Sequence, residues 1–316
     1  GDHICALEVM LGSGEIVRCT PDEEPELFWS TIGGMGLTGL ILTVDFCLTA
    51  VPSRAIDLET VRVEHLDHFF EASAASSDFT HVVSWVDTVK SGRAMGRGVL
   101  MRGRHAQRAQ RVSVGAVDRM AGLLGKMVDG KGFHSNALLN RATISMFNEA
   151  YFRKEKKGSA HSRVDIIPFF FPLDAVSNWN YVYGPRGFYQ YQFVVPERDA
   201  VRAALAEVTS SGQYSFLSVI KEFGDRDHGG LSFPTKGVTL AMDFPNTGDD
   251  LLGLFERLDA IVVEAGGRVY MGKDARLPAH RMRQMYPEWE RWKAVRDQYD
   301  PGRVFRSELG LRLELV

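Results

Sequence analysis

Predicted strands carry two glutamines, whose amides can bind sugar hydroxyls, and a lysine, which can bind an anion. In "YQYQFVV", Gln190 and Gln192 fall on one face of a strand, and Tyr191 and Phe193 face the opposite way. Paired amides can donate to and accept from sugar hydroxyls, although a solvated sheet face has the same pattern. Lys221 lies on the apolar strand "SVIKEFG", where a lysine either snorkels to solvent or is directed at an anion.

A second lysine and a third strand extend this pattern. Lys273 lies in a Gly-Lys-Asp turn after "RVY", and a lysine beside an aspartate is usually part of a surface ion pair of little value. On "GVTLAMDFP", Thr239, Ala241 and Asp243 share one face, which is small and polar, whereas the other face is apolar. The sequence therefore predicts neighbouring strands with one polar face and one core face.

Other kinds of chemistry leave no pattern in the sequence. No Ser-His-Asp order, metal-ligand spacing or P-loop stands out, and His3 and His81 have no visible partner. The basic runs 102–111 and 151–163 are typical of solvated loops, although either could receive a phosphate. We therefore predict no metal site.

The stretch 33–39, "GGMGLTG", contains a G-x-G-x-x-G motif. A dinucleotide fingerprint requires a strand before the glycines and a helix after them. Here "TPDEEPELFWST" precedes them and reads as a helix with Thr20 as its N-cap, and the β-branched "LILTVDFCLTAV" follows. The order is inverted, so we reject NAD binding and assign the glycines to a close approach of the backbone.

Composition and charge bound the class of protein. The chain has 316 residues, is 45% hydrophobic, and carries 37 Lys+Arg against 40 Asp+Glu. The net charge of −3 gives no general attraction to nucleic acid or to anionic membranes. No apolar run reaches the roughly 18 residues of a membrane span.

The cysteines and the N-terminus bear on compartment and completeness. Cys5, Cys19 and Cys47 are an odd number, which argues against a disulfide framework and favours a reducing compartment. The chain begins at Gly1 within apparent β-structure, so we expect that the natural N-terminus lies upstream.

The order of elements predicts an α+β fold with a mainly antiparallel sheet covered by helices on one face. A hairpin around Gly12 and Gly14 opens the chain. Further strands include "FTHVVSWVDTV", "FYQYQFVVP", "YSFLSVIKEFG" and "GVTLAMDFP", and "SRVDIIPFFFPLDAVSNWNYVYGP" reads as an aromatic strand and turn. Helices are predicted near 65–76, 197–211 and 248–265, and the tail reads as a strand, a helix and an Asp-Pro turn.

Several of these pieces, in this order, resemble one enzyme family. "ELFWSTIGGMGLTGLI", "GFYQYQFVVP", "YSFLSVIKEFG", "LAMDFP", "GGRVYMGKD" and "YDPGRVF" are similar to the flavoprotein oxidase subunits of decaprenylphosphoryl-β-D-ribose 2′-epimerases, which are vanillyl-alcohol-oxidase-type FAD enzymes. The resemblance implies that 1–53 is the second half of an FAD-binding domain whose first half is absent. It also implies a substrate-binding domain at 54–267 and a return to the FAD domain at 268–316.

The resemblance also assigns residues. Lys273 matches the catalytic lysine. FAD contacts match Gly1, Asp2, His3, Ile41 and Tyr270, and the glycine loop would lead into the strand that bears Ile41. The substrate pocket matches Trp85, Phe170, Asn180, Gln190, Gln192, Lys221 and Phe223. Ala241 lines the same pocket where mycobacterial members carry a cysteine, and Thr239 stands where they carry an asparagine, which puts the prenyl length and inhibitor response in doubt.

The implied activity is oxidation of the ribose 2′-hydroxyl of a polyprenyl-phosphoryl ribose to a keto sugar. An NAD(P)-dependent keto-reductase partner would complete epimerisation to arabinose for the cell wall. The expected location is cytoplasmic, peripheral at the inner membrane face, or periplasmic. Two alternatives stay open, namely an aldonolactone or alditol oxidase of the same fold and a non-catalytic module that binds sugar phosphate or lipid phosphate.

Overall fold

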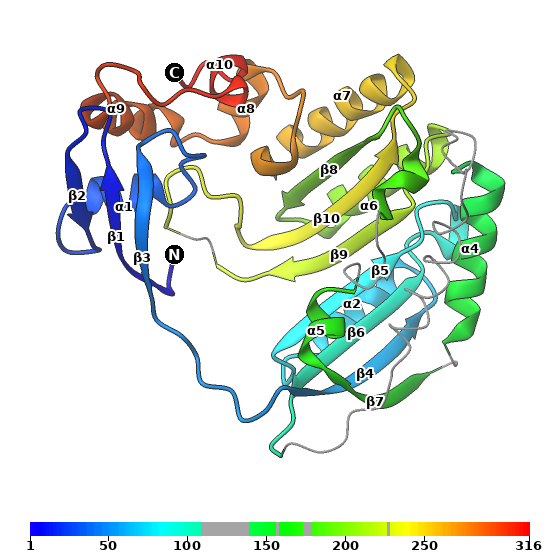
Figure 1. Ribbon diagram of the computed structural model, residues 1–316. Coiled ribbons are helices and arrows are strands. Elements are labelled where there is room, and N and C mark those ends of the chain that lie inside the picture. The colour runs from blue at the N-terminus through cyan, green and yellow to red at the C-terminus, as the bar shows by residue number, and fades with distance from the viewer. Residues whose placement is uncertain (109–138, 156–157, 173–178, 226–227) are drawn as a thin grey trace.

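Two antiparallel sheets organise the chain (Figure 1). The computed structural model describes residues 1–108, 139–155, 158–172, 179–225 and 228–316, with the backbone alone described for 179–180. A three-stranded sheet has the order β2-β1-β3, and an eight-stranded sheet has the order β11-β8-β10-β9-β5-β6-β4-β7. Every pairing in both sheets is antiparallel, as the sequence predicts.

Strands and helices are interspersed along the described parts of the chain, which ends in three consecutive α-helices. The strands are β1 (Ile4–Met10), β2 (Ile16–Cys19), β3 (Leu40–Phe46), β4 (Ala55–Val63), β5 (His81–Val86), β6 (Gly98–His105), β7 (Ser159–Asp165), β8 (Phe188–Val195), β9 (Leu217–Phe223), β10 (Gly237–Pro245) and β11 (Arg268–Val269). The α-helices are α1 (Pro25–Thr31), α2 (Leu66–Ala74), α4 (Arg141–Lys154), α5 (Ile166–Phe170), α6 (Arg198–Ser210), α7 (Asp249–Glu264), α8 (Ala279–Met285), α9 (Trp289–Tyr299) and α10 (Glu308–Arg312). Short 3-10 helices are η1 (Gly92–Ala94), η2 (Trp179–Tyr183) and η3 (Met271–Lys273).

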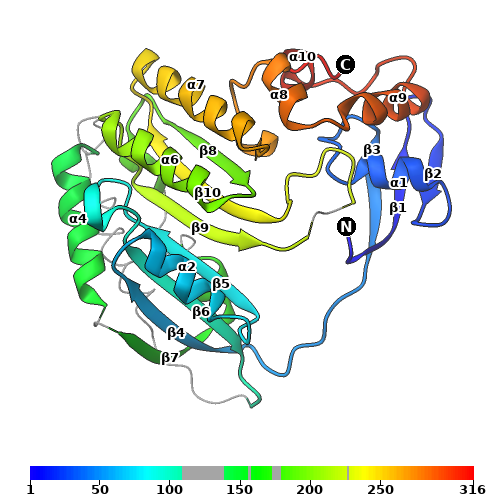
Figure 2. The ribbon, with the colours of Figure 1, turned by 180° about the vertical axis from the view of Figure 1, so that it is seen from behind.

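Helices lie on both faces of the large sheet, so the prediction of helices on one face is wrong. Figure 2 shows α2, α6 and α7 on one face, and Figure 1 shows α4 and α5 on the other. The first face holds the main hydrophobic core, to which alternate strand residues such as Tyr191, Phe193, Leu240 and Met242 contribute. On the second face, α4 and α5 cover the strands from β5 to β7. They carry enough apolar side chains to form small cores of their own.

Tyr191 ties α7 to the sheet. Its ring stacks on Phe255 with centroids 4.9 Å apart, and its hydroxyl donates to Asp259 over 2.8 Å. Arg276 donates twice to the same carboxylate, over 2.5 and 2.7 Å. A carboxylate buried to 1% exposure needs such partners, because burying an uncompensated charge is costly. The segment after β11 is therefore fixed against the sheet.

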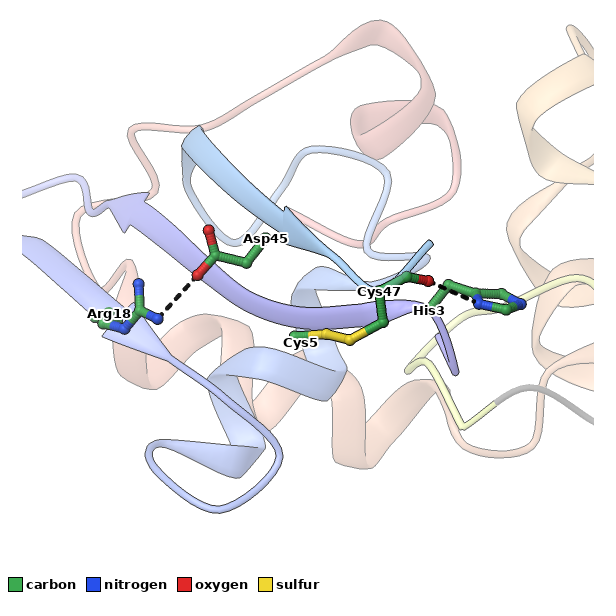
Figure 3. Close-up of a disulfide and its surroundings, with 5 residues drawn as sticks. All are labelled: His3, Cys5, Arg18, Asp45 and Cys47. Carbon is green, nitrogen blue, oxygen red and sulfur yellow. Dashed lines mark hydrogen bonds and ion pairs between the residues drawn. A yellow bond between two sulfur atoms is a disulfide. The ribbon is translucent and has the colours of Figure 1, made fainter. Parts of the chain in front are cut away.

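The small sheet carries a disulfide that the sequence analysis did not expect. Cys5 on β1 is joined to Cys47, just beyond β3, with Cα atoms 6.2 Å apart (Figure 3). The odd number of cysteines argued against a disulfide, but two of the three are joined, and the third, Cys19, is a free thiol that is fully buried on β2. Arg18 and Asp45 form an ion pair over 2.9 Å across the same sheet. The disulfide therefore joins the two strands near the N-terminal end of β1.

The glycine loop has the order helix, glycines, strand that the sequence predicts, and packing explains its glycines. A Cβ at Gly33, where φ is +74°, would lie 2.7 Å from Ser232 Oγ, and one at Gly39 would lie 2.4 Å from Val9 Cγ1. The loop therefore approaches both the β9–β10 connection and β1 too closely for a side chain. Helix α1, however, begins at Pro25, and Thr20 accepts hydrogen bonds from the N–H groups of residues 22 and 23 instead of capping the helix.

The C-terminal helices hold this loop against the rest of the molecule. Trp292 on α9 donates its indole N–H to the carbonyl of Ser30 over 2.9 Å. Arg296, with no exposed surface, donates to the carbonyl of Leu37 and forms an ion pair with Asp300. The "YDPGRVF" turn thus anchors α9, and α9 anchors the glycine loop.

Three local predictions are wrong. The basic runs were predicted as loops, but β6 includes 102–105 and β7 includes all of 159–163, because strand pairing with β4 outweighs their polar composition. Residues 151–154 end α4, and residues 109–111 and 156–157 lie outside the described part of the chain. The aromatic stretch near 166–170 forms α5 rather than a strand, with Asp165 capping it through a bond from the N–H of Ile167. The tail contains the additional helix α8, and β11 has only two residues.

The division of the chain at 53 and 267 stays a prediction. Residues 47–54 connect the two sheets, and β11, just after 267, pairs with β8 of the large sheet. Among the described residues, no helix combines the length and the apolar character needed to cross a membrane.

Candidate functional site

Polar side chains gather on the part of the large sheet that α4 and α5 leave uncovered. We call this surface the site face and define it by seven residues, namely Gln190, Gln192, Val219, Lys221, Thr239, Ala241 and Asp243. Strand register produces it, since Ala241 pairs with both Gln192 and Val219, and Asp243 pairs with Gln190. The predicted alternation on β8 and β10 therefore brings both amides and the polar side of β10 together.

Two lysines approach this face. Lys221 on β9 pairs with Thr239 on β10. Lys273 is the last residue of η3, and its charge acts on both Lys221 and Asp243. Loss of hydration lowers the pKa of Lys221, and the charge of Lys273 lowers it further. Among the described residues, neither ammonium group has an ion-pair partner within 4 Å. Two like charges held together without partners are unfavourable unless an anion or a polar ligand binds them.

Asp243 is the acidic member of the site face and is 6% exposed. Its carboxylate accepts a hydrogen bond from Gln190 Nε2 over 2.8 Å, and Gln192 Nε2 donates to Thr239 Oγ1 over 3.0 Å. Burial raises the pKa of Asp243 to about 6, while the bond from Gln190 and the charge of Lys273 lower it. Asp243 was placed on the polar strand face by the sequence but was not predicted as a site residue.

Aromatic rings border the site face at the Lys221 end. Tyr270 stacks on Phe233 with centroids 4.8 Å apart, and Phe233 meets Phe223 edge-on at 5.9 Å. The backbone N–H of Tyr270 donates to the carbonyl of Gln192 over 2.8 Å. The structure therefore brings the predicted residues Tyr270, Phe223 and Gln192 together. Phe233 was missed because it lies in the irregular segment before β10, where no periodicity identifies it.

Trp85 joins the same face through register. It pairs with Val219, and its ring meets Tyr151 of α4 edge-on at 4.8 Å. At 7% exposure, Trp85 lies at the border between the covered and the uncovered parts of the sheet. Trp85 therefore packs within the protein and exposes little surface to a ligand.

Two other predicted pocket residues are less close. Phe170 lies on α5 and meets His81 edge-on at 4.8 Å, so it lies over the start of β5, four residues before Trp85. Asn180 belongs to η2 by its backbone, and its side chain lies outside the described part of the chain. Their assignment to the pocket stays a prediction.

The predicted FAD contacts near the N-terminus belong to the small sheet. Gly1 and Asp2 lead into β1, and the ring of His3 shares a hydrogen bond with the carbonyl of Cys47 over 3.1 Å (Figure 3). Ile41 lies on β3, which pairs with β1 along one edge. The sequence grouped these residues with Tyr270, whereas the structure places them on a different sheet from it.

Two clefts among the described residues lie away from the site face. One of about 790 Å³ lies between α1 and α9, next to Trp29, His228 and Trp292. Another of about 560 Å³ lies between the β1–β2 hairpin and the turn at Pro301. Neither contains a lysine or a glutamine of the site face. Because charge and register rather than hollow volume identify the candidate site, we assign it to the sheet.

Comparison with known proteins gives a family match, a similar protein along the whole chain, and solved structures of similar fold. The family described as D-arabinono-1,4-lactone oxidase matches residues 242–313. The whole chain is 33% identical to decaprenylphosphoryl-beta-D-ribose oxidase of Mycolicibacterium smegmatis and covers 69% of that protein. Two solved structures are similar in fold, the xylooligosaccharide oxidase from Myceliophthora thermophila C1 in complex with xylobiose (TM-score 0.62, 13% identity) and a chitooligosaccharide oxidase (TM-score 0.61, 16% identity).

The two structures match 98% and 97% of this chain, which in turn spans 66% and 65% of their lengths. Their low identity supports the α+β fold alone. The 33% identity, by contrast, extends along the entire chain and includes the strands of the site face. The chain therefore belongs to the decaprenylphosphoryl-beta-D-ribose oxidase family of oxidoreductases.

Proposed function

We propose that the chain forms the substrate-binding part of an FAD-dependent enzyme that oxidises the ribose 2′-hydroxyl of a polyprenyl-phosphoryl-β-D-ribose. The product would be the 2′-keto sugar, the first half of an epimerisation to arabinose for cell-wall polysaccharide. The observation that carries the proposal is the site face itself, where two amides, a carboxylate and two lysines meet, and neither lysine has an ion-pair partner in the described part of the chain. A sugar phosphate offers the hydroxyls and the negative charge that such a face would bind.

The residues present fit a flavin. On β3, Leu40 and Leu42 share one strand face and are 50% and 44% exposed, while Ile41, 44% exposed, lies on the other face, so either face offers apolar surface to a flat ring. On the large sheet, Tyr270 and the two lysines offer a ring surface and hydrogen-bond donors to ring carbonyls. FAD, when bound, would supply the two-electron oxidant that takes a hydride from the carbinol carbon.

The chain's own residues would bind and orient the alcohol that is oxidised. Its hydroxyl must pass its proton to a base or a hydrogen-bonded chain as the carbon loses hydride, and Lys273 would hold the oxygen as negative charge develops there. Gln190 and Gln192 would orient the sugar, and Lys221 would meet an oxygen or the phosphate. Loss of hydration, and then the charge of Lys273, lower the pKa of Lys221, so an anionic substrate would favour its charged form.

We further propose that the keto product passes to an NAD(P)-dependent keto-reductase partner. The lipid tail of the substrate would keep the enzyme at a membrane surface by peripheral contact. The Cys5–Cys47 disulfide favours an oxidising compartment among the three locations considered.

The test uses the complete, flavin-loaded enzyme with a polyprenyl-phosphoryl ribose under single-turnover conditions. We expect bleaching of the flavin absorbance and a product lighter by two hydrogens. The Lys221→Gln variant should lose more activity on the phosphorylated sugar than on an uncharged alditol. An unbleached flavin with the phosphorylated sugar would contradict the proposal.

A second candidate is an aldonolactone or alditol oxidase, which the match of residues 242–313 to D-arabinono-1,4-lactone oxidase favours. Its substrate is uncharged, so Lys221 would have no anion to bind. Faster flavin bleaching by a lactone or alditol than by the phosphorylated sugar, unaffected by Lys221→Gln, would support this candidate instead.

A further inference from the structure

The two glutamines of the site face make different hydrogen bonds. Gln190 lies directly opposite Asp243 in the strand register and donates its Nε2–H to Oδ1 of that residue over 2.8 Å. Gln192 lies opposite Ala241 and reaches diagonally to Thr239 Oγ1 over 3.0 Å. Both amides are half-buried, and both contact β10, but one partner is a carboxylate and the other a hydroxyl.

This difference decides how freely each amide can turn over. An ionised carboxylate only accepts hydrogen bonds, so Gln190 must direct its NH2 group at Asp243 and its carbonyl oxygen away from it. A threonine hydroxyl both donates and accepts, so Gln192 can bind Thr239 through either end of its amide. Within the described part of the chain, the carbonyl oxygen of Gln190 accepts no hydrogen bond. It is therefore available to a ligand on the site face.

We propose that Asp243 is a positioning residue that fixes Gln190 with its carbonyl oxygen toward the substrate, so that this point of the site recognises a sugar hydroxyl as a hydrogen-bond donor. Gln192 is the adaptable partner, able to donate or accept. The inference deepens the proposed function and rests on it for the identity of the substrate. The orientation of Gln190 follows from Asp243 whatever the substrate is.

The surroundings of Asp243 keep it in place. Its backbone N–H donates to Ser215 Oγ over 3.0 Å, and Phe244 beside it is fully buried. The ionisable groups that act on its carboxylate come from two other elements, Lys273 after β11 and Tyr183 of η2. Because Lys273 favours the ionised form, the acceptor-only state prevails near neutral pH.

Acid should release Gln190. Burial raises the pKa of Asp243 to about 6, so below that pH the carboxyl group carries a proton and can donate to the carbonyl of Gln190. The amide can then turn over and present its NH2 group to the ligand. Selectivity for a donating hydroxyl should therefore fall as the pH drops through about 6.

The first experiment measures selectivity in the flavin-loaded enzyme. The ratio of kcat/KM is taken between a polyprenyl-phosphoryl ribose and its 3′- and 5′-deoxyfluoro analogues, since fluorine cannot donate. In the wild type, at least one analogue should be about 10- to 100-fold worse. Asp243→Asn, whose amide donates or accepts, should reduce that ratio at least several-fold, and Thr239→Val should leave it unchanged.

Each outcome decides the inference. A ratio in Asp243→Asn equal to that of the wild type, with both variants folded by thermal unfolding, would overturn it. Wild-type ratios near one for both analogues would overturn it as well. Wild-type selectivity that weakens below about pH 6, and a selectivity in Asp243→Asn that does not depend on pH, would support it.

The second experiment needs no turnover and separates this inference from the proposed function. The carboxyl carbon of Asp243 is titrated by 13C NMR in the wild type and in Gln190→Leu. The amide donor lowers the Asp243 pKa, so its removal should raise the titration midpoint. An unchanged midpoint would overturn the inference. Failure to oxidise the sugar, with the midpoint shifted, would count against the proposed function alone.

Discussion

One sheet face has two differently built halves. Where α4 covers it, charged groups are paired with one another. Asp87 accepts from Arg97 over 2.9 Å and from Asn148 over 2.8 Å, and Arg97 also pairs with Glu149 over 2.8 Å. Where no described helix covers it, Lys221 and Lys273 lie near one another, and no described residue forms an ion pair with either. Both halves can be followed in Figure 1, one under α4 and the other on β8, β9 and β10.

The difference separates structural from functional charge. A charge that a helix buries must be paired, because an unpaired buried charge costs several kcal/mol, and the covered half meets that requirement fully. The uncovered half keeps two cations together at an electrostatic cost that stability alone does not explain. We therefore expect the half that holds these two lysines to bind the ligand.

The largest effect should come from Lys273 in the uncovered half. Lys273→Ala should slow reduction of bound flavin by substrate about 100-fold or more, because a cation that stabilises a developing oxyanion is lost. FAD should stay bound, and unfolding should be nearly unchanged. Stopped-flow absorbance measures the rate, and Lys236→Ala, at an 82% exposed side chain, is the matched control. Reduction of Lys273→Ala at the wild-type rate would remove Lys273 from the catalytic role.

In the covered half, the comparable effect should appear in stability. Asp87→Ala leaves Arg97 buried at 7% exposure with one partner fewer and should lower the free energy of unfolding by about 3–5 kcal/mol. Asp67→Ala breaks an exposed ion pair with Arg202 and should cost less than about 1 kcal/mol. Urea titrations compare the two variants. Equal losses would mean that coverage by α4 does not determine the value of a charge.

A smaller effect on activity is expected at the sheet amides. Gln192→Ala should lower kcat/KM about 10- to 100-fold, because a substrate hydroxyl in a dry site would lose its partner, while unfolding changes little. Gln213→Ala, at an amide that accepts from Thr247 on the surface, is the control. A specificity constant that does not change in Gln192→Ala would show that this side chain faces solvent.

The smallest effect should be a pH dependence in the covered half. Hydrogen bonds from Arg97, and then from Arg153, lower the pKa of Glu149 from 4.5 to about 2. Because the folded-state pKa lies below the unfolded one, the carboxylate stabilises the fold above about pH 4.5, and that contribution is lost as the pH falls toward 2. The difference in unfolding free energy between the wild type and Glu149→Gln should therefore shrink over this interval. A difference that is constant with pH would contradict the network.

Strand periodicity predicted much of the site. The period of two on β8 and β10 placed Gln190, Gln192 and Ala241 on one face, and the structure confirms that placement. Asp243 was on the predicted polar face but went unrecognised, because its importance comes from the neighbouring strand and from Lys273. The basic runs were misread as loops, since pairing partners far apart in sequence decide whether a polar stretch becomes a strand.

By itself, the sequence determined the alternation of faces, the inverted order of helix, glycines and strand around 33–39, and the antiparallel α+β class. Each depends on local period and composition, which a single chain displays directly. Only the tertiary structure decided that α4 covers half of the face, that Cys5 meets Cys47, and that Lys221 and Lys273 lie together. These contacts join residues dozens of positions apart, and local propensity carries no information about which distant surfaces will pack together.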